Sequence, residues 1–219
     1  MAHPLVLVYG ETSHLRFPLV LFVGREPNDS DRVGEDMAIY DFDSQEKVNG
    51  IIKRRSRCTF WNMAYKLVGE FGPEEQLTVR GLKDKCKEAR SSIVSFADVS
   101  PRSIRSAETG KRIEREEMRL TEFHRHFEAL IHAEIFSRVN LVLLAGSDKD
   151  GLSSQRTELE TMLNEAKQER IAYQVPFLST YSYEALRKQI RSSVGISSKI
   201  REVYDVWEHH RSTSLKYRR

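Results

Sequence analysis

The sequence has few cysteines and no long apolar run. Its two cysteines, Cys58 and Cys86, are too few for a disulfide framework, and alone they cannot complete a metal cage. Apolar runs such as Leu19–Val23 and Leu141–Ala145 are far shorter than the roughly 20 residues that span a bilayer. No basic segment followed by a small-residue cleavage site opens the chain, so we expect no signal peptide. We therefore expect a cytoplasmic protein, nucleoid-associated if bacterial, with no membrane partner, metal or cofactor.

The chain does have enough apolar residues for a core, together with a mildly basic surface. Its 219 residues are 39% apolar and 31% charged, which excludes a disordered or fibrous protein and fits a single domain, 1–219. The formal net charge of +3 permits an anionic partner without requiring one. Cations gather in the block 53–57 and in a basic C-terminal helix and tail, 199–219. Each is either solvated surface or a patch that contacts phosphates.

Short apolar runs alternate with segments whose apolar residues recur at helical spacing. The runs bounded by turn residues predict strands at 17–23, 92–99, 140–145 and 171–177. The helical spacing predicts helices at 60–68, 114–137, 157–170, 183–192 and 200–210. Leu5–Tyr9 is either an edge strand or the end of an N-terminal element. This alternation predicts the α/β class, a three-layer α/β/α fold around a mostly parallel four-stranded sheet.

Loops that follow parallel strands are where such folds place their ligands. The loop 24–31 carries Glu26 directly after a buried strand, and Pro27 fixes the backbone behind it. A carboxylate held in this way can orient or deprotonate a water, although a Glu-Pro pair is also an ordinary structural turn. The loops 98–102 and 177–183 add hydroxyl, carboxylate and aromatic groups, so the three loops predict one pocket.

Five segments resemble, in order, motifs of the uracil-DNA glycosylase superfamily, and most closely its mismatch-specific uracil/thymine branch. Segment 19–28 (LVLFVGREPN) resembles the first motif, an apolar strand followed by Gly-x-Asn/Glu/Gln/Asp-Pro. Segment 59–65 (TFWNMAY) resembles the Phe-Trp…Tyr helix of that branch. Segments 93–102 and 141–146 resemble its second strand with its loop and its third strand, and 175–182 lies where the last motif belongs.

The resemblance implies a DNA base-excision glycosylase, which hydrolyses the N-glycosidic bond of uracil or another modified or mismatched base flipped from DNA. By position, Glu26 matches the water-activating residue, and Asp98 lies near the base-reading residue. Ser179 matches the serine that holds a target-strand phosphate, and Tyr181 matches the region that wedges into the duplex. The other residues expected at substrate or DNA are Gly24, Arg25, Pro27, Asn28, Tyr40, Phe42, Lys53, Arg54, Arg55, Arg57, Arg102 and Thr180. Of these, Tyr40 or Phe42 would stack on the base.

The last motif departs from the family pattern, and this leaves alternatives open. Phe177 and Leu178 stand where the family has His or Asn and then Pro. This favours a second hypothesis, a catalytically inactive nucleic-acid-binding protein on the same fold. A third is an unrelated α/β enzyme that binds a nucleotide at Gly146–Gly151, although this loop lacks both common glycine-rich phosphate motifs. The expected partner is single- or double-stranded DNA, and nothing in the sequence indicates an oligomer, so we expect a monomer.

Overall fold

The computed structural model describes residues 6–8, 18–24, 39–41, 59–89, 91–98, 120–132, 136, 138–144, 153–166, 171–173 and 183–216. Its strands are β1 (Val6–Val8), β2 (Leu19–Gly24), β3 (Ile39–Asp41), β4 (Val94–Asp98), β5 (Val139–Leu144) and β6 (Ile171–Tyr173). Its helices are α2 (Thr59–Phe71), α3 (Val79–Ala89), α4 (Leu120–His132), α5 (Ser153–Ala166), α6 (Tyr183–Ser192) and α7 (Val194–Lys216). Strands and helices alternate over most of this length, which confirms the α/β class.

The six described strands form one sheet in the order β3-β1-β4-β2-β5-β6. The four predicted strands are its parallel part, because β4 pairs with β2, β2 with β5 and β5 with β6, all in parallel. The expected count of four strands was too low, since β1 and β3 extend the sheet beyond β4. These two strands are parallel to each other, and β1 is antiparallel to β4. The apolar run Leu5–Tyr9 therefore contains a strand, β1, and this is an interior strand of the sheet rather than an outermost one.

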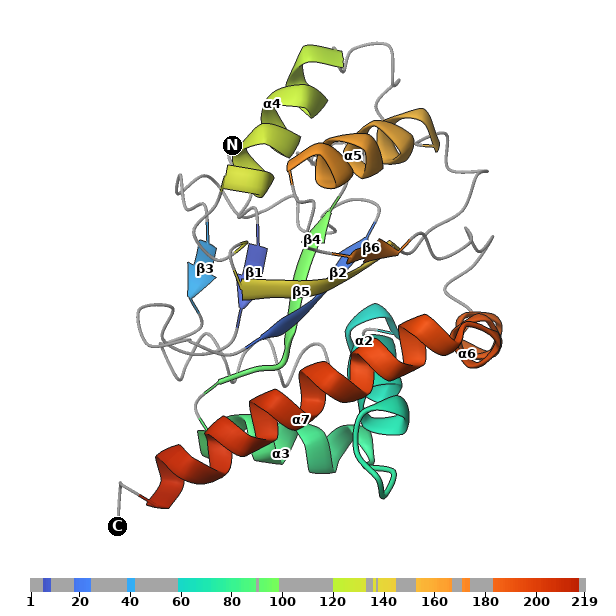
Figure 1. The fold of residues 1–219 in the computed structure, drawn as a ribbon. Coiled ribbons are helices and arrows are strands. Elements are labelled where there is room, and N and C mark those ends of the chain that lie inside the picture. The colour runs from blue at the N-terminus through green and yellow to red at the C-terminus, as the bar shows by residue number, and fades with distance from the viewer. Residues whose placement is uncertain are drawn as a thin grey trace, which may run out of the picture.

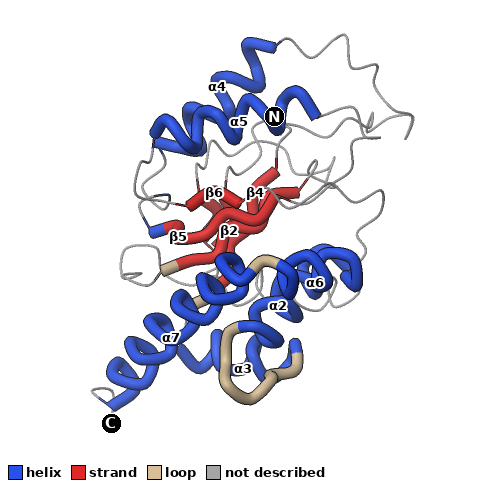
Figure 2. The backbone as a smooth tube through the Cα atoms, turned by 45° about the vertical axis from the view of Figure 1, so that its right-hand side comes forward, coloured by secondary structure: helices blue, strands red, loops and turns tan. Residues whose placement is uncertain are grey.

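Helices cover both faces of the sheet, which gives the expected three layers. Figure 1 and Figure 2 show α4 and α5 on one face, and α2, α3, α6 and α7 on the other. All six residues of β2 are buried, as expected for a parallel strand between two helical layers. Leu19, Leu21 and Val23 belong to the core under α4 and α5, whereas Val20 and Phe22 belong to the core under the other helices. This alternation follows from the two-residue period of a strand.

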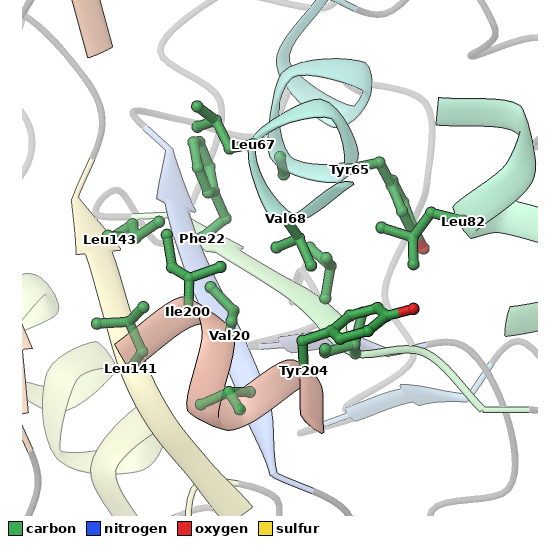
Figure 3. Packing of buried hydrophobic residues seen from close by; sticks show 14 of the residues in the cluster. Val20, Phe22, Tyr65, Leu67, Val68, Leu82, Leu141, Leu143, Ile200 and Tyr204 are labelled. Carbon is green, nitrogen blue, oxygen red and sulfur yellow. The ribbon is translucent and has the colours of Figure 1, made fainter. Parts of the chain in front are cut away.

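Helix α7 closes the larger core. It is longer than the predicted helix at 200–210 and packs across α2, α3, α6 and the central strands. Ile200 is fully buried and Tyr204 is almost so. Figure 3 shows Ile200 beside Val20 of β2 and near Leu141 of β5, and all three belong to the larger core.

One described helix was not predicted. Helix α3 begins after Thr78, whose hydroxyl accepts a hydrogen bond of 3.0 Å from the backbone N–H of Gly81. This is the usual capping geometry at the first turn of a helix. Leu82 and Cys86 are its buried residues, one helical turn apart, and they join the larger core. The helix thus occupies a stretch for which the sequence analysis gave no element.

Candidate functional site

The carboxyl ends of β2 and β4 lie side by side at one edge of the sheet. Gly24, the last residue of β2, is the register partner of Asp98, the last residue of β4. One step earlier in β2, Val23 pairs with Ala97 on one side and with Leu144 of β5 on the other. The segments that follow Gly24, Asp98 and Leu144 therefore leave the sheet at the same edge, as the carboxyl-end rule for parallel sheets requires.

Strand β6 adds a fourth chain exit at this edge. Tyr173 ends β6 and is the register partner of Leu143 in the parallel strand β5. The chain then runs through 174–182 to the first residue of α6, Tyr183. The residues predicted to hold a phosphate therefore lie in a segment that follows, along the chain, the strand next to β5.

The structure brings together two of the predicted site residues and places a third elsewhere. The backbones of Gly24 and Asp98 are neighbours, as described above. Tyr40 lies in the middle of β3, level with Leu7 of β1 and Phe96 of β4. Two strands separate it from β2, and β3 runs in the opposite direction, so its carboxyl end lies at the other edge of the sheet. The remaining predicted site residues lie outside the described residues: Arg25, Glu26, Pro27, Asn28, Phe42, Lys53, Arg54, Arg55, Arg57, Arg102, Ser179, Thr180 and Tyr181.

A charged cluster that was not expected from the sequence joins α2 to one face of α6. The carboxylate of Glu70, only 9% exposed, accepts hydrogen bonds from the Tyr183 hydroxyl, from Nε of Arg187 and, at 2.7 Å, from a terminal nitrogen of Arg191. Burial opposes the ionisation of Glu70, but these hydrogen bonds and the two guanidinium charges outweigh it and lower its pKa. The signal in the sequence was the four-residue spacing of Tyr183, Arg187 and Arg191, which puts them on one helix face.

The same cluster carries more cations than carboxylates. Nζ of Lys66 lies 3.6 Å from the centroid of the Tyr183 ring, a cation–π contact. Arg187 also pairs with Glu184 at 3.2 Å. Three cations thus meet two carboxylates, Glu70 and Glu184, and one positive charge remains. Lys66 and half of the Arg191 side chain are exposed, so this charge is presented at the surface.

Three buried hydroxyls near the start of β4 form hydrogen bonds inside the core. The hydroxyls of Tyr65 and Ser92 are 3.0 Å apart, and Ser92 also bonds the backbone of Val94 at the first residue of β4. Trp207 of α7 donates to the hydroxyl of Ser91. Tyr65, which belongs to the segment that resembles the Phe-Trp…Tyr helix, therefore has its hydroxyl engaged in the core at the amino end of β4.

The described residues hold no group of three His, Cys, Asp or Glu side chains that could bind a metal ion. Cys86 is buried, and burial raises the pKa of its thiol to about 12, so it is a poor nucleophile at neutral pH. Within the same residues, no helix is both long and apolar enough to cross a membrane.

Comparison with known proteins gives no relative: no family model, no curated protein and no solved structure matches the chain. A functional assignment therefore depends on the motifs and on where the topology places them.

Proposed function

We propose that this chain is a DNA glycosylase on a uracil-DNA glycosylase-like fold, which hydrolyses the N-glycosidic bond of uracil or of another modified or mismatched base. The observation that carries the proposal is the register pairing of Gly24 with Asp98 on adjacent parallel strands. Because of this pairing, the strands of two motif-like segments, 19–28 and 93–102, end next to each other. The residues of each segment that follow its strand therefore start from neighbouring positions. Glu26 and Asp98 would then serve one bound base.

The other two strands of the parallel part support the proposal. The segment that resembles the third strand forms β5, which pairs directly with β2. The segment placed at the last motif follows β6, the next strand in the sheet. Four segments from distant parts of the chain therefore leave one edge, where a flipped base can be enclosed by all of them.

The proposed reaction needs only DNA and water. A water held by Glu26 attacks C1′ of the sugar as the bond from C1′ to the base nitrogen breaks. Glu26 accepts the proton of this water, and the bonding electrons leave with the base. Asp98 reads the edge of the base, and Ser179 holds a neighbouring phosphate. The base takes up a proton and Glu26 gives up the one it accepted, so the products are the free base and an abasic site.

The replacement of the usual last motif by Phe177 and Leu178 favours one alternative, binding without cleavage. Neither side chain can donate a hydrogen bond to the departing base, as the usual His or Asn does. On this alternative the chain recognises DNA and leaves the glycosidic bond intact.

The test incubates the chain with labelled single- and double-stranded oligonucleotides that contain uracil, hypoxanthine or a T:G mismatch, followed by alkali to break abasic sites. We expect cleaved product from the wild type, and at least 100-fold less from Glu26→Gln, in line with the usual contribution of a general base (~100-fold or more). Glu75→Gln, a matched loss of one exposed carboxylate in the turn after α2, should keep full activity.

Two results would contradict the proposal. DNA binding without product from any substrate would replace it by the binding alternative. The absence of both binding and product, together with a thermal shift on addition of ATP or NAD, would favour the nucleotide-binding enzyme instead.

A further inference from the structure

Lys66 and Arg191 form a cationic face beside Glu70. This acid has more hydrogen-bond donors around it than its two oxygens need for one partner each. Glu70 is almost buried, and its carboxylate already accepts hydrogen bonds from Tyr183 and Arg187. These two donors give each oxygen of the carboxylate one partner, and Arg187 itself is also paired with Glu184. Arg191 is a third donor to the same carboxylate, through one terminal nitrogen at 2.7 Å, and its side chain stays 52% exposed.

These contacts hold the two outer cations in place without neutralising them. The single charge of Glu70 is divided between Arg187 and Arg191, while Lys66 lies over the Tyr183 ring. A guanidinium offers five N–H groups in a rigid plane, so the bond to Glu70 orients Arg191 and leaves further donors for another anion. Fixing a side chain before a ligand arrives lowers the entropy that binding must overcome.

The position of this face along the chain indicates which anion it meets. Tyr183, at its centre, comes four residues after Ser179, and four residues span at most about 14 Å. A DNA strand whose phosphate is held at Ser179 therefore has its next phosphates within reach of α6, because a strand advances only about 3.4 Å per nucleotide.

We propose that Lys66 and Arg191 contact backbone phosphates of the bound DNA strand beside the site, with Glu70 as the residue that positions Arg191. This inference rests on the proposed DNA binding. Phosphate contacts fix the position of a nucleic acid and carry no sequence information, so these two contacts add affinity and salt dependence and leave base selection to the edge of the sheet.

The test measures the affinity of the full chain for undamaged duplex DNA by fluorescence anisotropy, between about 50 and 200 mM salt. Each lost phosphate contact should make the slope of log affinity against log salt shallower by about 0.9. We expect this change in Arg191→Gln and in Lys66→Gln. Over that fourfold rise in salt, the affinity of each variant should fall by about 3.5-fold less than that of the wild type.

Two further variants separate charge from structure. Arg191→Lys keeps the cation and should keep the wild-type slope. Arg80→Gln removes a cation from α3 whose side chain is 93% exposed, and it should leave the slope unchanged.

The outcomes distinguish this inference from the proposed function. DNA binding with a wild-type slope in both Gln variants, or an equal change in Arg80→Gln, would overturn the phosphate contacts and leave the glycosylase proposal standing. A wild-type chain that binds no DNA would overturn both. Lys66→Gln removes a cation–π contact to the Tyr183 ring and leaves the hydrogen bonds of Glu70 in place, so it carries the test if Arg191→Gln fails to fold.

Discussion

Nε1 of Trp207 in α7 donates a hydrogen bond to the Ser91 hydroxyl, 3.1 Å away, and both side chains are buried. The bond links the last described helix to a residue three positions before β4 and 116 positions earlier in the chain than Trp207. Trp207→Phe should lower the free energy of unfolding by about 1–3 kcal/mol, because it leaves a buried hydroxyl without its donor. Urea unfolding monitored by circular dichroism measures this loss. Val206→Ala, an exposed change on the same helix, should shift stability by no more than about 0.5 kcal/mol.

Glu70 should make the protein less stable in acid. Its pKa is lowered in the folded state, so its contribution is complete above its ordinary value of 4.5 and is lost as pH falls through the lower, folded value. Glu70→Gln should cost about 2 kcal/mol at pH 7, where charged hydrogen bonds are lost, and progressively less as the pH is lowered through that range. Urea unfolding at several pH values gives both curves. Glu74→Gln, exposed just after α2, is the control, and a constant gap between wild type and Glu70→Gln at all pH values would contradict the assignment.

The parallel part of the fold was predictable because its signals are local. The run that forms β2 is apolar without interruption, and helix α6 has the bounds that the helical spacing predicted, Tyr183–Ser192. Strand β3 has only three residues, and its pairing with β1 depends on a partner more than 30 positions away. Such a short segment has no periodicity of its own, and its existence is decided by tertiary contacts.

Helix α3 was missed although its pattern was present. Val79, Leu82, Cys86 and Ala89 recur at intervals of three and four residues, which is helical spacing, and Thr78 is a typical cap. Many charged residues lie between these four positions. Together with Gly81, they lower the mean hydropathy of the segment and make its apolar stripe less visible. A test for periodicity, rather than for apolar content, would have found this helix.

The candidate site was predicted in part. The rule that ligands bind at the carboxyl ends of parallel strands placed Gly24 and Asp98 together, and the register of β2 and β4 agrees. The cluster around Glu70 was not predicted, because nothing local relates this residue to α6, more than 110 positions later. Only the packing of α2 against α6 reveals that one acid meets two arginines.

His124 should titrate above its ordinary pKa. Its ring lies between two carboxylates, with Nδ1 3.2 Å from Glu158 of α5 and Nε2 3.3 Å from Glu128 of its own helix. The hydrogen bond to Glu158 is the larger cause of the raised pKa, and Glu128 adds to it. A proton NMR titration should show a midpoint above 6.5, the ordinary value, that falls further in Glu158→Gln than in Glu128→Gln.

The same residue gives a pH dependence opposite in sign to that of Glu70. A raised folded pKa stabilises the protein below pH 6.5, and this contribution is lost as the pH rises through the folded value. Between slightly acid and slightly alkaline pH, the wild type should therefore lose more of its free energy of unfolding than His124→Gln does. Equal midpoints in the wild type and in Glu158→Gln would show that α4 and α5 do not make this contact in solution.

Gly72 should not tolerate alanine, and it shares this crowding with Gly69, where a Cβ would lie 2.6 Å from the carbonyl oxygen of Leu77. A Cβ at Gly72 would lie 2.7 Å from the Val68 carbonyl oxygen and 2.8 Å from Cβ of Tyr204. The backbone cannot easily move aside, because the N–H of Gly72 donates to the same carbonyl at 2.9 Å. Gly72→Ala should therefore lower the free energy of unfolding by about 1–3 kcal/mol, the usual cost of overpacking.

The matched control is the same substitution at Gly81 in α3. There a Cβ would come no closer than 3.3 Å to its nearest neighbour, the hydroxyl of the capping residue Thr78, which needs to give by only a few tenths of an ångström. Alanine is favoured over glycine inside a helix by about 1 kcal/mol, so Gly81→Ala should be neutral or stabilising. Urea unfolding of the two variants compares the effects under one set of conditions. Opposite signs would support the close approach of α7 to the end of α2, whereas equal and small effects would show that Tyr204 does not pack against Gly72.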